Sequence, residues 1–161
     1  MKKINHFIGG EEYISKSDRF GDVFNPAIGE KIADVSLANG DDVQAAISSA
    51  KSAFNSWSKT PVLTRSRVMF KFKELLLRDM DKLAAQVTEE HGKILSDAAG
   101  SVTRGMEVVE FMSGAPHLLK GEFSENVGTN IDSWSMRQPL GICVGITPFN
   151  FPAMVPMWMF V

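Results

Sequence analysis

The side chain best suited to chemistry in this sequence is the amide of Asn150, which stands between two apolar runs, residues 142–146 and 153–161. The order predicts a buried strand, a tight turn that holds Asn150, and the start of a helix. Ligands of α/β proteins bind where strands end. A preorganised amide there stabilises an oxygen that gains negative charge in a transition state, by about 2.7–4 kcal/mol. The alternative is that Asn150 simply caps the following helix, since asparagine is a good N-cap and Pro152 is tolerated in a first turn.

Arg104 is the second candidate, because it lies in a predicted helix with little other basic charge nearby. A guanidinium can hold a carboxylate through two parallel hydrogen bonds. The alternative is an ordinary surface ion pair with Glu107 or another acid. Gly105, which follows directly, would let another segment pass close to the helix.

The other reactive side chains are weaker candidates for a functional role. Cys143 is the only cysteine, so no internal disulfide can form, which is typical of a reducing compartment. It lies inside the predicted strand without an adjacent base, which favours a buried small hydrophobe over a nucleophile. The three histidines are not spaced as metal ligands, and no metal site is expected. The sequence contains no glycine-rich phosphate loop.

The elements that would position these residues follow from the apolar pattern. Glycines 9 and 10 predict a hairpin turn, and strands are expected over residues 20–24 and 30–35. Four helices with apolar stripes follow, and we expect these stripes to be core. Their predicted N-terminal caps are, in order, Asp41, Thr64, Asp79 or Asp81, and Ser96. A strand pair over residues 122–127 and 129–136, joined at Gly128, precedes the strand that leads to Asn150.

The composition sets broad limits. A chain of 161 residues, 44% hydrophobic, allows one domain of ordinary size with its own core. The net charge of −2 gives no reason to expect nucleic acid or an anionic membrane as a partner. The N-terminus lacks the apolar stretch of a secretory signal. We therefore expect a cytoplasmic protein without a membrane partner.

Residues 146–152 (Ile-Thr-Pro-Phe-Asn-Phe-Pro) resemble the strand–turn motif of the aldehyde dehydrogenase superfamily, and the resemblance extends over residues 5–161. Five further segments agree with it: residues 7–10, 25–29, 53–57, 90–93 and 137–141. Within the superfamily the chain is similar to the methylmalonate-semialdehyde dehydrogenases, which acylate coenzyme A. Phe149 in place of the commoner tryptophan and the segments 104–111, 114–116 and 154–160 carry this closer likeness.

The resemblance implies an α/β fold, the N-terminal part of an aldehyde-dehydrogenase-like fold that begins a Rossmann-type cofactor domain. Residues 1–121 would form strands and helices of that domain, residues 122–138 an oligomerisation hairpin, and residues 139–161 the start of the parallel-sheet core. The nucleophilic cysteine and the general-base glutamate would lie beyond Val161, so the chain is expected to be an inactive N-terminal fragment.

The resemblance also implies roles for residues. Asn150 would be the oxyanion-hole asparagine, and Arg104 would hold the carboxylate of a small semialdehyde substrate. NAD would be the cofactor and coenzyme A a co-substrate. The parent protein is expected to be a homodimer or homotetramer. Two alternatives stay open: a semialdehyde dehydrogenase that releases a free acid, and a non-catalytic assembly fragment that acts through the hairpin. The residues expected to line the NAD site are Ile146, Thr147, Pro148 and Phe149.

Overall fold

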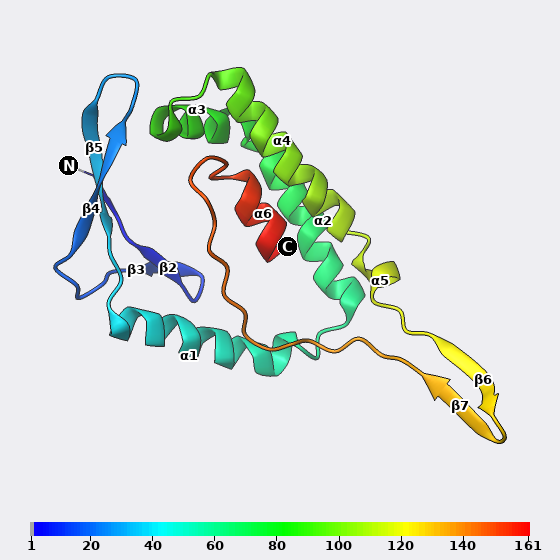
Figure 1. Cartoon of the computed structure of the whole chain (residues 1–161). Coiled ribbons are helices and arrows are strands. Elements are labelled where there is room, and N and C mark those ends of the chain that lie inside the picture. The colour runs from blue at the N-terminus through cyan, green and yellow to red at the C-terminus, as the bar shows by residue number, and fades with distance from the viewer. Residues whose placement is uncertain (1) are drawn as a thin grey trace.

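The computed structural model describes residues 2–161 and shows a mixed α/β chain (Figure 1). None of the helices described there has the length and apolarity needed to cross a membrane. The strands are β1 (Lys2–Ile4), β2 (His6–Ile8), β3 (Glu11–Tyr13), β4 (Phe20–Asn25), β5 (Glu30–Ser36), β6 (Phe123–Gly128) and β7 (Ile131–Trp134). The helices are α1 (Gly40–Trp57), α2 (Val62–Arg78), α3 (Met80–His91), α4 (Leu95–Met112), α5 (Ala115–Leu118) and α6 (Met154–Phe160).

The described strands form three small sheets. In the first, β5 lies between β1, which runs parallel to it, and β4, which runs antiparallel. The β2–β3 hairpin turns at Gly9 and Gly10, both with positive φ, as the glycine pair predicts. The β6–β7 hairpin stands away from the helices (Figure 1). These pairings confirm the predicted strands of the first forty residues and the predicted strand pair near residue 128.

The core lies where α2, α3, α4 and α6 meet. Val102 and Val109 of α4 are fully buried, and Leu76 of α2 and Met157 of α6 pack with them. Burial of such side chains contributes about 1.5–3 kcal/mol each. The predicted apolar stripe of α4 is therefore confirmed as core.

Helix α6 crosses α4 at Gly105. A Cβ placed on this residue would lie 3.1 Å from the Cα of Met154 and would overlap the side chain of Met157. Both methionines are buried against α4. The missing side chain at position 105 thus permits the close approach that the sequence suggested.

Some predictions for the helices were wrong. The apolar face of α1 was expected in the core, but Val43 and Trp57 on this face are 52% and 46% exposed. The N-cap of α1 is Asn39 rather than Asp41. Neither Thr64 nor Ser96 is a cap, because α2 and α4 begin after Pro61 and Ile94 without a side-chain hydrogen bond.

The start of α1 is a reciprocal capping box. The side chain of Asn39 accepts hydrogen bonds from the backbone N–H groups of Asp41 and Asp42, at 2.9 and 3.0 Å. The carboxylate of Asp42 accepts from the Asn39 N–H at 2.8 Å and from the Ser15 hydroxyl at 2.6 Å. Led by the Ser15 bond, these contacts hold the pKa of Asp42 below its ordinary value. The box therefore also ties α1 to the segment after β3.

We expect Asn39→Ala to lower the free energy of unfolding by about 1 kcal/mol, because two N–H groups of the first turn lose their acceptor. Because the folded pKa of Asp42 is lowered, its contribution is present above the ordinary value of 3.8 and is lost as the pH falls through the folded pKa. Urea unfolding from neutral to acid pH measures both effects. Asp42→Asn should flatten this pH dependence, whereas Asp41→Asn, whose exposed side chain is outside the box, should not. Equal slopes in the two variants would contradict this account.

Candidate functional site

Asn150 lies in a bend between the extended residues 139–148 and helix α6, and it is exposed. It is not the N-cap of α6, which is Ala153 and has no side-chain cap hydrogen bond. The capping alternative for Asn150 is therefore wrong in this structure. The Asn150 backbone carbonyl accepts a hydrogen bond from Nζ of Lys93 at 3.0 Å.

The strand expected over residues 142–146 is absent from the described chain. These residues have no secondary structure, and Val144 and Ile146 are 86% and 90% exposed. An inner strand forms only when neighbouring strands take up its backbone N–H and C=O groups. Residues 2–161 place no strand beside this segment. For the same reason Cys143 is exposed, contrary to the expectation that it is buried.

Lys93 is the residue that joins the turn of Asn150 to helix α4. Its ammonium lies 3.0 Å from the carbonyl oxygen of Asn150, 3.5 Å from the hydroxyl of Ser101 and 4.4 Å from the ring centroid of Phe151. Gly92, in the left-handed conformation after α3, reverses the chain just before it. The sequence contained Lys93 only as part of a resembling segment, and nothing local indicated its contact with a residue 57 positions away.

Arg104 borders a cavity of about 330 Å³ at the N-terminal half of α4. Lys93, Asp97 and Phe151 also line it, so two cationic side chains and one carboxylate border this space. Arg104 is exposed, and among residues 2–161 it forms no ion pair with Glu107 or any other acid. The guanidinium is therefore available to an anionic ligand. The alternative of a surface ion pair is wrong for the described residues.

The four residues expected at the NAD site lie on the uncovered stretch before Asn150. Ile146 and Phe149 are 90% and 88% exposed, Pro148 is exposed and Thr147 half-buried. Phe149 lines a different cavity, of about 580 Å³, with Phe24 of β4 and His91 of α3. The structure thus groups Arg104 with Lys93 and Phe151. It does not place Asn150 on the wall of either cavity.

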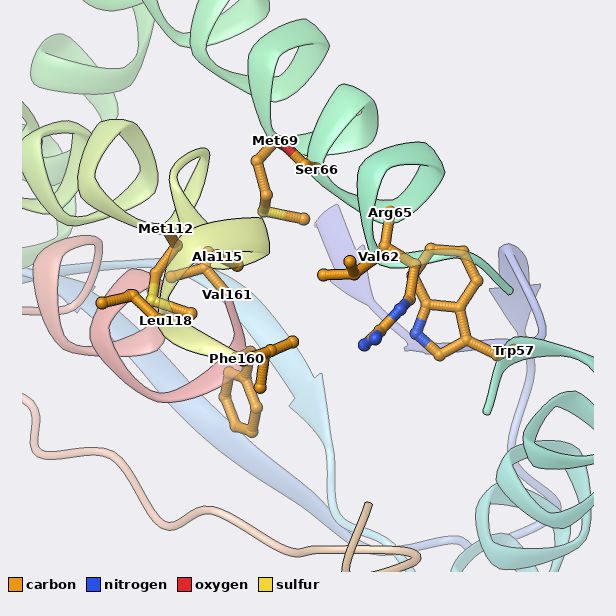
Figure 2. A pocket seen from close by; sticks show the side chains of 11 residues that line it. Trp57, Val62, Arg65, Ser66, Met69, Met112, Ala115, Leu118, Phe160 and Val161 are labelled. Carbon is orange, nitrogen blue, oxygen red and sulfur yellow. The ribbon is translucent and has the colours of Figure 1, made fainter. Parts of the chain in front are cut away.

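A third cavity, of about 370 Å³, lies between α2, α5 and the end of α6 (Figure 2). Figure 2 shows mainly carbon and sulfur atoms around it, among them Met69 and Met112. Two of its polar side chains have partners within the chain, since Nε of Arg65 donates to the Thr60 carbonyl and the Ser66 hydroxyl donates to the Ser113 carbonyl. This cavity resembles an uncovered piece of core more than a reaction site.

Comparison with known proteins decides the family. The sequence profile described as aldehyde dehydrogenase family matches residues 13–161. The chain belongs to this family. Among family members, it is 50% identical over 160 residues to the malonate-semialdehyde dehydrogenase of Pseudomonas aeruginosa, covering 99% of this chain and 32% of that protein. It is 49% identical over 158 residues to an acylating mitochondrial methylmalonate-semialdehyde dehydrogenase of Arabidopsis thaliana, covering 98% and 26%.

Solved structures of the family share the fold. A methylmalonate-semialdehyde dehydrogenase of Oceanimonas doudoroffii superposes with a TM-score of 0.96 at 53% identity, over 99% of this chain and 33% of that one. A protein of Sinorhizobium meliloti assigned to the same enzyme type, solved in complex with NAD, gives 0.96 at 49% over the same shares. The α/β fold of the family is thereby confirmed. The chain spans about a third of the length of these relatives.

Proposed function

We propose that residues 1–161 are the N-terminal part of an NAD-dependent, coenzyme A-acylating malonate- or methylmalonate-semialdehyde dehydrogenase. The whole enzyme would convert semialdehyde, coenzyme A and NAD to acetyl- or propionyl-coenzyme A, carbon dioxide and NADH. The observation that carries the proposal is the guanidinium of Arg104, which has no ion-pair partner among residues 2–161 and borders a cavity beside the turn of Asn150. The names of relatives about half identical to this chain support the same substrate class.

Each candidate residue has a role in this proposal. Arg104 binds the far carboxylate of the semialdehyde through its fork of N–H donors. Asn150 donates its amide N–H to the carbonyl oxygen as a cysteine thiolate attacks the aldehyde carbon. That thiolate is not Cys143, which has no base beside it. We therefore propose that residues 1–161 alone do not oxidise aldehydes.

The uncovered stretch of Ile146, Thr147, Pro148 and Phe149 is proposed to hold NAD, which when bound accepts the hydride. This stretch fits the cofactor because Ile146 and Phe149 are almost fully exposed and form an apolar surface. A flat ring can pack on such a surface. Thr147 would contribute mainly through its backbone. Coenzyme A enters as the acceptor of the acyl group.

We further propose that the whole enzyme is a homodimer or homotetramer in the cytoplasm. The β6–β7 hairpin carries exposed Phe123, Ile131 and Trp134, at 58–66% exposure. A lone two-stranded hairpin is marginally stable in water, so a second subunit would supply its missing contacts. Release of a free acid, and a purely structural assembly role, are the competing functions.

A hybrid enzyme tests the proposal. In it, residues 1–161 replace the matching third of the Pseudomonas aeruginosa malonate-semialdehyde dehydrogenase. With NAD and malonate semialdehyde we expect NADH, and acetyl-coenzyme A as product when coenzyme A is added. Formation of a free acid without need for coenzyme A would favour a semialdehyde dehydrogenase that releases a free acid. Absence of NADH would favour a purely structural assembly role. Residues 1–161 alone should produce none.

Arg104→Leu in the hybrid enzyme should raise KM for malonate semialdehyde about 10- to 100-fold, since a charged hydrogen-bonded contact contributes about 1.5–3 kcal/mol. KM for propanal, which lacks the carboxylate, should not change. Glu107→Gln, one turn along the same helix, is the matched control and should behave as the parent. Equal loss on both aldehydes would exclude carboxylate recognition by Arg104.

A further inference from the structure

The turn of Asn150 has few supports of its own. Residues 139–148 before it form no strand, and α6 after it begins without a side-chain cap. Within residues 2–161, apart from the local bond of the Val155 N–H to the Phe151 carbonyl at the start of α6, the bond from Lys93 to the Asn150 carbonyl is the one hydrogen bond that reaches residues 147–152 from outside them. The orientation of Asn150 therefore depends on this one polar contact and on packing.

The ammonium of Lys93 is itself held on helix α4. Ser101 is 2% exposed, and its hydroxyl donates to the Asp97 carbonyl at 2.9 Å, which fixes the oxygen that faces Lys93. The second contact is the Phe151 ring, 4.4 Å from the ammonium, in cation–π geometry. The lysine thus grips both residues 150 and 151 from a fixed point on α4.

We propose that Lys93 is a positioning residue for the reaction: it fixes the Asn150–Phe151 peptide and so aims the Asn150 amide. This inference rests on the proposed function. The carbonyl of Asn150 belongs to the peptide that follows its Cα, so holding that oxygen limits rotation about the Cα–C bond of Asn150 and fixes the backbone from which the side chain projects. A misplacement of about 1 Å costs roughly 100-fold in rate, which makes such a contact matter for catalysis.

The kinetic test uses the hybrid enzyme. Lys93→Met keeps the chain length and the apolar stem but removes the three N–H donors. We expect kcat to fall about 10- to 100-fold with KM for malonate semialdehyde changed less than threefold. Lys93→Arg, which keeps charge and donors, should recover most of kcat. Lys120→Met, an exposed lysine, is the matched control and should have parent kinetics. A rise in KM at constant kcat would instead make Lys93 a substrate ligand and overturn the proposal.

A second readout separates this inference from the proposed function. In residues 1–161 alone, NMR order parameters of the backbone at 150 and 151 should fall in Lys93→Met, and those in the core of α4 should not change. Lys120→Met should leave both unchanged. If the hybrid enzyme with Lys93 intact is inactive, the proposed function fails while this measurement still tests the contact. Unchanged order parameters at the turn would overturn the positioning role, whatever the activity.

Discussion

Replacing Asn150 with alanine in the hybrid enzyme is expected to lower kcat about 100- to 1,000-fold and to leave KM nearly unchanged. An oxyanion-hole donor acts on charge that exists only in the transition state, so its loss appears in kcat. Asn150→Asp should be at least as severe, because a carboxylate repels the forming oxyanion. Steady-state kinetics with malonate semialdehyde as substrate measure both variants.

The stability of these variants distinguishes chemistry from folding. The Asn150 side chain is exposed and forms no hydrogen bond within residues 2–161, so the melting temperature of residues 1–161 should not change in Asn150→Ala. Asn55→Ala, at an exposed position of α1, is the matched control for kinetics. A loss that appears in KM alone, or only together with unfolding, would argue against oxyanion stabilisation.

Gly105→Leu should have the largest effect on stability, a loss of about 3 kcal/mol, at the upper end of what overpacking usually costs. The new Cβ would stand 3.1 Å from the backbone Cα of Met154, which cannot move aside as a side-chain end can. Helix α6 would be displaced from α4, and the buried Met154 and Met157 would lose their contacts. Chemical denaturation of residues 1–161 measures the change.

The matched control for this variant is Gly100→Leu, on the same helix. A Cβ at position 100 meets no atom within 4 Å, and leucine is a better helix former than glycine by up to about 1 kcal/mol. Gly100→Leu should therefore be neutral or stabilising. If both glycine variants lost the same stability, the close crossing of α4 and α6 would not be the cause.

Much of the fold could be predicted because the signals are local. The stop at Gly92, the turn at Gly9 and Gly10, and the buried stripe of α4 each depend on residues within a few positions of one another. Predicted helix starts were less accurate. Asn39 and Asp42 form the capping box of α1. Asp41, which lies between them, is also a residue type that caps helices well, so the sequence alone does not show which residue is the cap.

The wrong predictions have one physical origin: the structures of these segments depend on contacts with distant parts of the chain, which the local sequence does not encode. The apolar run 142–146 has the composition of a buried strand, but no described strand pairs with it. The apolar face of α1 is partly exposed for the same reason. At the site, Arg104 borders a cavity, and its binding of an anionic ligand stays a prediction. The contact of Lys93 with Asn150 could not be predicted, because 57 residues separate them.

The turn of Asn150 is attached to α4 at two points, by the ammonium of Lys93 seated on Ser101 and by α6 crossing at Gly105. Arg104 belongs to the same helix, immediately beside that crossing. A thermal displacement of α4 as a rigid body therefore carries the turn with it. Motions of the neighbouring helices should therefore change the distance between the Arg104 guanidinium and the Asn150 amide less than if the two groups were attached to different helices.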